Sequence, residues 1–188
     1  NAKLNNHPII KSFVAGITKL DTISFNAQIN NQRDTTLQAN VFIPQIEYDT
    51  SSINNARFRI FGANNRAEYE GNVSQILFSD YRFRRLFVGG EVENNVLDLN
   101  LLAKDSLNAT RYGLAANLRS IDKKLRLNFT KKGILIDYRV WESDSTGYLE
   151  YSSDGIFINN LQLRQEKQKL TINSQNKIPN SPLTILID

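Results

Sequence analysis

The stretch Leu125-Arg126-Leu127-Asn128-Phe129 alternates apolar and polar residues with a period of two, as does Ile23-Ser24-Phe25-Asn26-Ala27-Gln28-Ile29. Successive side chains of a β-strand point to opposite faces of its sheet. Alternation of this kind is therefore typical of strands with one apolar face and one polar face. Similar runs fill most of residues 21–188 and predict an all-β fold.

Short connections rich in Asn, Gly and Pro separate these runs, which favours antiparallel pairing of neighbours as a meander. A meander of so many strands should twist, curl or close. One short helix is predicted at residues 8–16, where Pro8 suits a first turn and apolar residues recur every four positions. The predicted strands are 21–30, 35–43, 55–63, 65–70, 72–79, 81–88, 91–103, 110–119, 123–130, 133–141, 146–151, 155–163, 168–174 and 182–188.

Composition excludes several classes of protein. The chain has 188 residues, 40% of them hydrophobic, which is enough for a folded core and argues against disorder. The net charge of +4 is spread along the chain, so we expect no nucleic-acid partner. Without cysteine there is no disulfide or thiolate metal site. We interpret the chain, which starts at Asn1 and ends inside an apparent strand, as a single β segment, residues 1–188, of a longer protein.

No arrangement of catalytic side chains is apparent. The only histidine is His7, in a predicted loop, and a lone histidine is seldom a metal ligand or a triad member. Glu68 and Glu70, like Glu91 and Glu93, share a strand face and could form an acid–base pair. Residues two apart on a strand always share a face, however, so solvated carboxylates are the favoured interpretation. We therefore predict a protein that is not an enzyme and carries no cofactor or metal.

Clustered cations allow two interpretations. They could meet anionic lipid head groups or an acidic partner at a rim, or they could keep the edges of the sheet soluble and prevent edge-to-edge pairing. The second is favoured. The residues are Arg82, Arg84, Arg85, Lys123, Lys124, Arg126, Lys131 and Lys132.

A series of motifs in the second half of the chain is similar to those of a known family. Asp105 closes an apolar strand, a Tyr112-Gly113-Leu114 block and the run from Lys124 follow, and a strand ending at Trp141 comes next. Then come Gly155-Ile156-Phe157-Ile158-Asn159-Asn160-Leu161 and Gln168-Lys169-Leu170-Thr171-Ile172-Asn173-Ser174. This order resembles the AsmA-like family of Gram-negative envelope proteins, and its TamB-type translocation and assembly modules in particular, over roughly residues 50–188.

Two positions depart from the family pattern. The Asn that usually follows the Trp is replaced near Thr146-Gly147-Tyr148, and the last motif ends in Ser174 instead of Gly. The resemblance implies a long sheet folded lengthwise into a taco-like groove, in a periplasmic, inner-membrane-anchored protein. It implies phospholipid transport between the two membranes and assembly of outer-membrane proteins, with an outer-membrane barrel protein of the TamA or BamA type as partner of the full-length protein.

An apolar sheet face that no second layer covers would suit acyl chains, because each methylene that leaves water contributes about 0.8 kcal/mol. The predicted lipid-groove residues are Phe25, Ala27, Ile29, Leu97, Leu99, Leu101, Leu114, Ala116, Leu118, Leu125, Leu127, Phe129, Ile134, Ile136, Tyr138, Leu170 and Ile172. The alternative is that these residues form the closed core of a structural or adhesive β-sandwich that binds glycans or protein at the cell surface.

Overall fold

The computed structural model describes residues 2–4, 16–31, 36–79 and 81–188. Strands make up 78% of these residues, and the described part of the chain contains no α-helix. The predicted helix at 8–16 lies, except for Gly16, outside the described residues, as does His7. The strands are β1 (Ala2–Leu4), β2 (Ile17–Leu20), β3 (Ile23–Asn30), β4 (Thr36–Tyr48), β5 (Ser51–Ala63), β6 (Arg66–Phe78), β7 (Tyr81–Glu93), β8 (Val96–Lys104), β9 (Thr110–Ile121), β10 (Lys124–Ile136), β11 (Arg139–Ser143), β12 (Tyr148–Ser152), β13 (Gly155–Asn159), β14 (Leu161–Gln165), β15 (Gln168–Ser174) and β16 (Leu183–Ile187).

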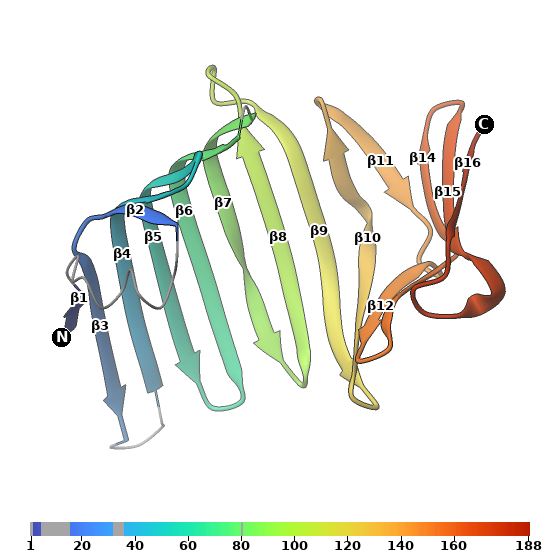
Figure 1. Ribbon diagram of the computed structural model, residues 1–188. Helices are drawn as coiled ribbons and strands as arrows, with labels where there is room; N and C mark the ends of the chain where they lie inside the picture. Colours follow the sequence, from blue (N-terminus) through green and yellow to red (C-terminus); the bar gives the residue numbers. More distant parts are fainter. Residues whose placement is uncertain (1, 5–15, 32–35, 80) are drawn as a thin grey trace. The chain divides into compact units, whose positions relative to one another are not determined.

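All sixteen strands belong to one antiparallel sheet. Its order is β1-β3-β4-β5-β6-β7-β8-β9-β10-β11-β14-β15-β16, while β2 pairs with β4, and β12 pairs with β10 and β13. From β3 to β11, neighbours in sequence are neighbours in the sheet (Figure 1). Along the described strands the sheet is open. The predicted all-β antiparallel meander is therefore confirmed.

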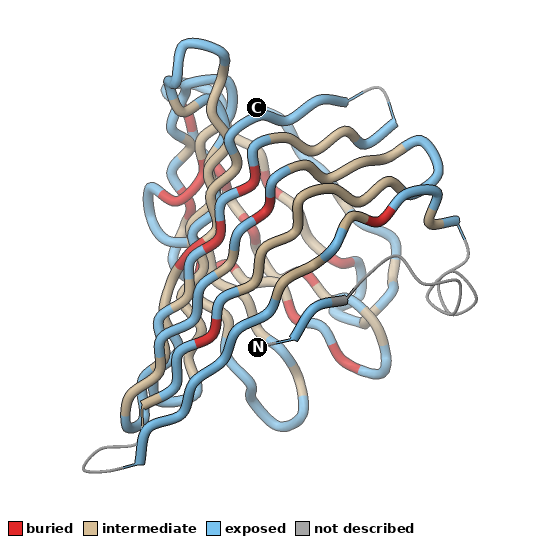
Figure 2. The backbone as a smooth tube through the Cα atoms, turned by 90° about the vertical axis from the view of Figure 1, so that its left-hand side faces the viewer, coloured by how far each residue is buried: buried red, intermediate tan, exposed pale blue. Residues whose placement is uncertain are grey.

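The chain divides into two compact units. Unit 1 comprises Asn1–Glu91 and Ala103–Ala109, and unit 2 comprises Val92–Leu102 and Thr110–Asp188. In Figure 2 the buried positions appear as short, separate segments along the strands. The buried apolar residues described in unit 1 are Leu20, Ala39, Ala56 and Val73, whereas those of unit 2 include Ile134, Ile158, Leu161 and Leu163, which form one cluster.

Several strand boundaries differ from the predicted ones. Gly89 and Gly90, which we predicted to form a turn, lie inside β7, and the turn comes at Asn94 and Asn95. Gly71, predicted to separate two strands, lies inside β6. Its cross-strand partner is Phe58, and a Cβ at position 71 would lie 2.5 Å from the Phe58 ring. Glycine is present here because an aromatic ring occupies the space of a side chain, not because the chain turns.

A bulge interrupts β10 where a turn was predicted. The ladder between β9 and β10 pairs Phe129 with Ala116 and next Ile134 with Leu114. Residues 130–133 of β10 thus lie opposite the single residue Ala115 of β9, which is the pattern of an extended β-bulge. The shift of three residues moves the apolar positions of β10 from odd to even numbers and keeps them on the same face of the sheet.

Candidate lipid-binding face

One face of unit 1 is apolar across β3, β4 and β5. The ladders pair Phe25 with Val41 and Val41 with Phe58. They also pair Ala27 with Ala39 and Ala39 with Ile60. Directly paired residues of an antiparallel ladder share a face. We call this set the unit 1 apolar face: Phe25, Ala27, Ile29, Leu37, Ala39, Val41, Phe58 and Ile60.

Large side chains of the unit 1 apolar face are exposed to solvent. The exposed fraction is 69% for Ile29, 43% for Phe25 and 41% for Ile60, whereas Ala39 between them is buried. Contiguous exposed apolar surface of this kind usually marks an interaction site. Sequence reasoning placed only the three β3 residues in this surface. The residues of β4 and β5 alternate in the same way, so the signal for them was present in the sequence.

The opposite face of unit 1 is polar, and the glutamates considered as a catalytic pair lie there. Arg59 contacts Glu70 at 3.3 Å. Arg66 contacts Glu68 at 2.9 Å and Glu91 at 2.5 Å. The side chains of Glu68 and Glu70 are about half exposed, which is typical of solvated ion pairs on the surface of a sheet.

Unit 2 has an apolar face of its own on β8, β9 and β10. The β9–β10 ladder pairs Leu118 with Leu127, Ala116 with Phe129, and Leu114 with Ile134. On β8, Asp98 accepts a hydrogen bond from the Asn117 amide of β9. Since side chains alternate along a strand, Leu97 and Leu99 point away from that bond, toward the face of Ala116 and Leu118.

Part of the unit 2 apolar face is covered by a hydrophobic core. Ile134, Ile158, Leu161 and Leu163 form this cluster, each with less than 10% exposure. Among the predicted groove residues, Phe129, Leu170 and Ile172 pack against the cluster together with Trp141 and Leu149. The predicted groove residues of unit 2 with more than a third of their surface exposed are Leu101, Leu125, Ile136 and Tyr138.

Tyr138 does not belong to a strand. The prediction placed it in a strand ending at Trp141, but β10 ends at Ile136 and β11 begins at Arg139. Asp137 and Tyr138 form the turn between them and have positive φ values of 49° and 67°. The turn is held to β9, because Arg111 bonds the Asp137 carboxylate at 2.8 Å and its carbonyl accepts the Tyr138 N–H at 3.0 Å.

An ion-paired cluster that sequence reasoning missed lies on β10 and β12. Glu150, whose side chain is only 10% exposed, contacts Lys124 and Arg126 at 2.9 Å each. The Arg126 guanidinium also stacks 4.2 Å from the centre of the Tyr148 ring. The hydrogen bonds that Lys124 and Arg126 donate to the Glu150 carboxylate lower the pKa of Glu150, and the bond that Lys124 donates also raises the pKa of Lys124. Two of the clustered cations thus stabilise the sheet by pairing with a buried carboxylate.

The described residues contain no group of three or more His, Cys, Asp or Glu side chains that could hold a metal ion. Among the same residues, no helix is long and apolar enough to cross a membrane. Comparison of the chain with protein-family models, with curated proteins and with solved structures finds no match. The resemblance to TamB-type proteins therefore stays a prediction.

Proposed function

We propose that this chain is a segment of a TamB-like envelope protein that binds phospholipid acyl chains on its apolar sheet face and lets them move along it. The observation that carries the proposal is the exposure of Phe25, Ile29 and Ile60 on a face that is apolar over three consecutive strands. The order of sequence motifs that resembles the TamB type supports the same function. Acyl chains need no catalytic group and no cofactor to bind there.

The energy of such binding follows from the area covered. A sixteen-carbon chain that left water completely would gain roughly ten kcal/mol, at about 0.8 kcal/mol for each methylene. An acyl chain that lies on an open sheet face, with only one of its sides in contact with the protein, gains roughly half of that free energy. A uniform apolar wall offers similar contacts at each position along it, so a lipid can slide with small barriers between positions.

The hydrophobic core of unit 2 narrows the surface that we propose for lipid. Phe129, Ile134, Leu170 and Ile172 pack in or against the core cluster, so their contribution is to the stability of unit 2. The proposed lipid contacts are the unit 1 apolar face and, in unit 2, the exposed Leu101, Leu125 and Ile136.

Two neighbouring residues on β5 provide a matched test. Ile60 and Phe61 are both 41% exposed. Ile60 pairs with Ala39 and Tyr69 on the apolar face, whereas Phe61 pairs with Gln38 and Glu68 on the polar face. Ile60→Arg and Phe61→Arg therefore add the same charge at the same exposure on opposite sides of the sheet.

We expect Ile60→Arg to weaken binding of a fluorescent sixteen-carbon fatty acid about a hundredfold. A guanidinium at this position would displace roughly four methylenes from the wall, a loss of about 3 kcal/mol. Phe61→Arg should bind like the unchanged protein. Equal affinity of both variants, or no measurable binding by the unchanged chain, would contradict the proposal.

The alternative of a structural or adhesive β-domain is favoured by one observation, the closed core of unit 2. In that case the exposed apolar residues of unit 1 would bind protein rather than lipid. Native mass spectrometry of the gently purified chain separates the two functions, because a lipid-binding segment should retain copurified phospholipid. An adhesive domain would show none.

A further inference from the structure

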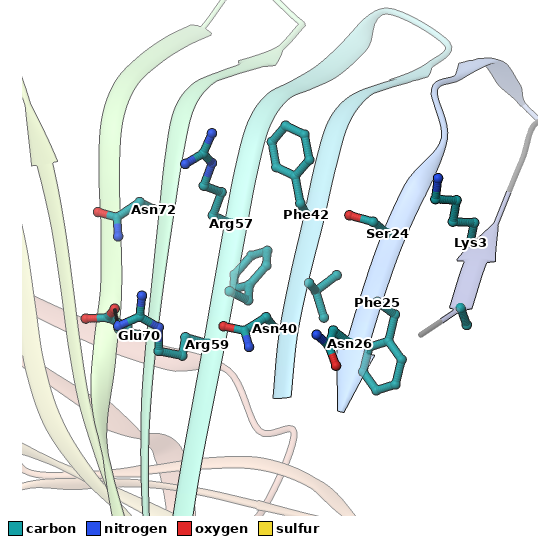
Figure 3. A pocket seen from close by; sticks show the side chains of 13 residues that line it. Lys3, Ser24, Phe25, Asn26, Asn40, Phe42, Arg57, Arg59, Glu70 and Asn72 are labelled. Atoms are coloured by element: carbon teal, nitrogen blue, oxygen red, sulfur yellow. Dashed lines mark ion pairs between the residues drawn. The ribbon is translucent and has the colours of Figure 1, made fainter. Parts of the chain in front are cut away.

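The polar face of unit 1 contains a second candidate binding site, a groove of about 770 Å³. This volume lies within the range of sites for small molecules. Figure 3 shows its side chains arranged in two rows that run across the strands. The Lys3 row consists of Lys3, Ser24, Phe42, Arg57 and Asn72, and the Arg59 row of Asn26, Asn40, Arg59 and Glu70.

The strand register places both rows on one face. Lys3 pairs with Ser24, Ser24 with Phe42, and Phe42 with Arg57, which in turn pairs with Asn72. The Lys3 row therefore crosses five strands, a length of roughly 19 Å at about 4.8 Å between strands. The residues between the rows, such as Val41 and Phe58, belong to the unit 1 apolar face. The side chains of both rows thus lie on the opposite face of the sheet from the unit 1 apolar face, although Phe25, Val41 and Phe58 of that face also line the groove.

The charge of the groove is positive. Lys3, Arg57 and Arg59 line it with Glu70 as the single carboxylate. Within the described part of the chain, Glu70 pairs with Arg59, and neither Lys3 nor Arg57 has a carboxylate partner. The Arg57 guanidinium instead lies 5.0 Å from the centre of the Phe42 ring. Two cations are therefore available to a ligand, separated along the row by Ser24 and Phe42.

We propose that this groove binds an acidic oligosaccharide. The unpaired cations match carboxylate or sulfate groups, with which arginine forms strong bidentate hydrogen bonds. The amides of Asn26, Asn40 and Asn72 both donate and accept hydrogen bonds, as sugar hydroxyls do. Phe42 offers a ring on which the apolar side of a sugar can pack. A groove that crosses five strands suits an extended chain of several units better than a single ion.

The probe for this site is tetragalacturonic acid, with the neutral maltotetraose as its comparison. Isothermal titration of the whole chain should show binding of the acidic tetrasaccharide that weakens with added salt, and much weaker binding of maltotetraose. Arg57→Gln should weaken the acidic probe about tenfold, the effect of losing one charge-assisted contact. Lys3→Gln should weaken it in the same direction.

Lys167→Gln is the matched control, because Lys167 lies in the turn after β14, outside the groove, and carries the same charge. It should leave the affinity unchanged, as should Ile60→Arg on the opposite face, which separates this proposal from the lipid-binding one. The proposal is overturned if Arg57→Gln has no effect, or if Lys167→Gln weakens binding equally. Tighter binding of a single-stranded oligonucleotide than of the tetrasaccharide would also overturn it.

Discussion

Truncation of Ile134 should be far more destabilising than truncation of Ile60. Ile134 is 8% exposed in the core cluster of unit 2, and Ile60 is 41% exposed on the unit 1 apolar face. Both substitutions to Ala remove the same three carbon groups. The comparison therefore measures directly which part of the apolar surface is a closed core.

The expected magnitudes follow from burial. Three buried carbon groups account for about 2.5 kcal/mol of transfer free energy, and the cavity left at Ile134 raises the total to about 3 kcal/mol or more. At Ile60 nearly half of the side chain is already in water, so Ile60→Ala should cost about 1 kcal/mol. For a chain of this length, a loss of about 3 kcal/mol lowers the melting temperature by roughly 10 °C.

Trp141 provides the assay. It is the only tryptophan of the chain and packs against the cluster that contains Ile134. Urea unfolding followed by its fluorescence should give a lower midpoint for both variants, with a decrease for Ile60→Ala of about a third of that for Ile134→Ala. If Ile60→Ala lowered the midpoint as much as Ile134→Ala, the unit 1 apolar face would be as enclosed as the core, and the distinction drawn between the two would be wrong.

Two further predictions concern the sheet of unit 2. Gly133→Ala should cost about 2 kcal/mol in the same urea assay, because the added Cβ would meet the backbone carbonyl oxygen of Ala115 inside the bulge; an unchanged midpoint would refute this reason for glycine. Since Lys124 and Arg126 lower the pKa of Glu150, the Glu150 carboxylate binds a proton less tightly in the folded state than in the unfolded state. The ion pairs of Glu150 therefore contribute their full stabilisation above the ordinary pKa of a glutamate. This contribution is lost as the pH falls through the lowered pKa of the folded state. Glu150→Gln should flatten the decline in unfolding free energy on acidification, and an equally steep decline would count against the pairing.

The period-two alternation was sufficient to predict the fold class, because one-sided strands such as 124–129 and 23–29 have no helical alternative of comparable regularity. Breaks in the alternation were harder to interpret. In β10 the apolar positions change from odd numbers, as at Phe129, to even numbers, as at Ile134. A bulge inside a strand breaks the alternation in the same way as a turn between two strands. In β4 and β5 the ladder passes from the Ile43–Ala56 pair to the Gln45–Asn54 pair across Pro44 and Asn55, and Asn55 has a positive φ of 50°. An irregularity inside a long strand resembles the end of a short one.

Exposure was the property that the sequence could not provide. Leu127 and Ile134 alternate in the same way as Ile29 and Ile60, yet Ile134 is buried by residues of β13 and β14, which lie more than twenty residues away in the chain. Pairings of that kind, like the contact of Glu150 with Lys124 and Arg126 across β10 and β12, depend on tertiary register. Local residue patterns determine strands, but not which of their faces another element covers.

Site-specific photo-crosslinking tests the lipid proposal most directly. A benzophenone side chain placed at position 60 or at position 61 reports which face of β5 contacts acyl chains in a mixture of the chain with phospholipid vesicles. We predict crosslinks to phospholipid from position 60 and few from position 61. Equal yields from both positions, or lipid adducts from position 61 alone, would contradict binding at the apolar face.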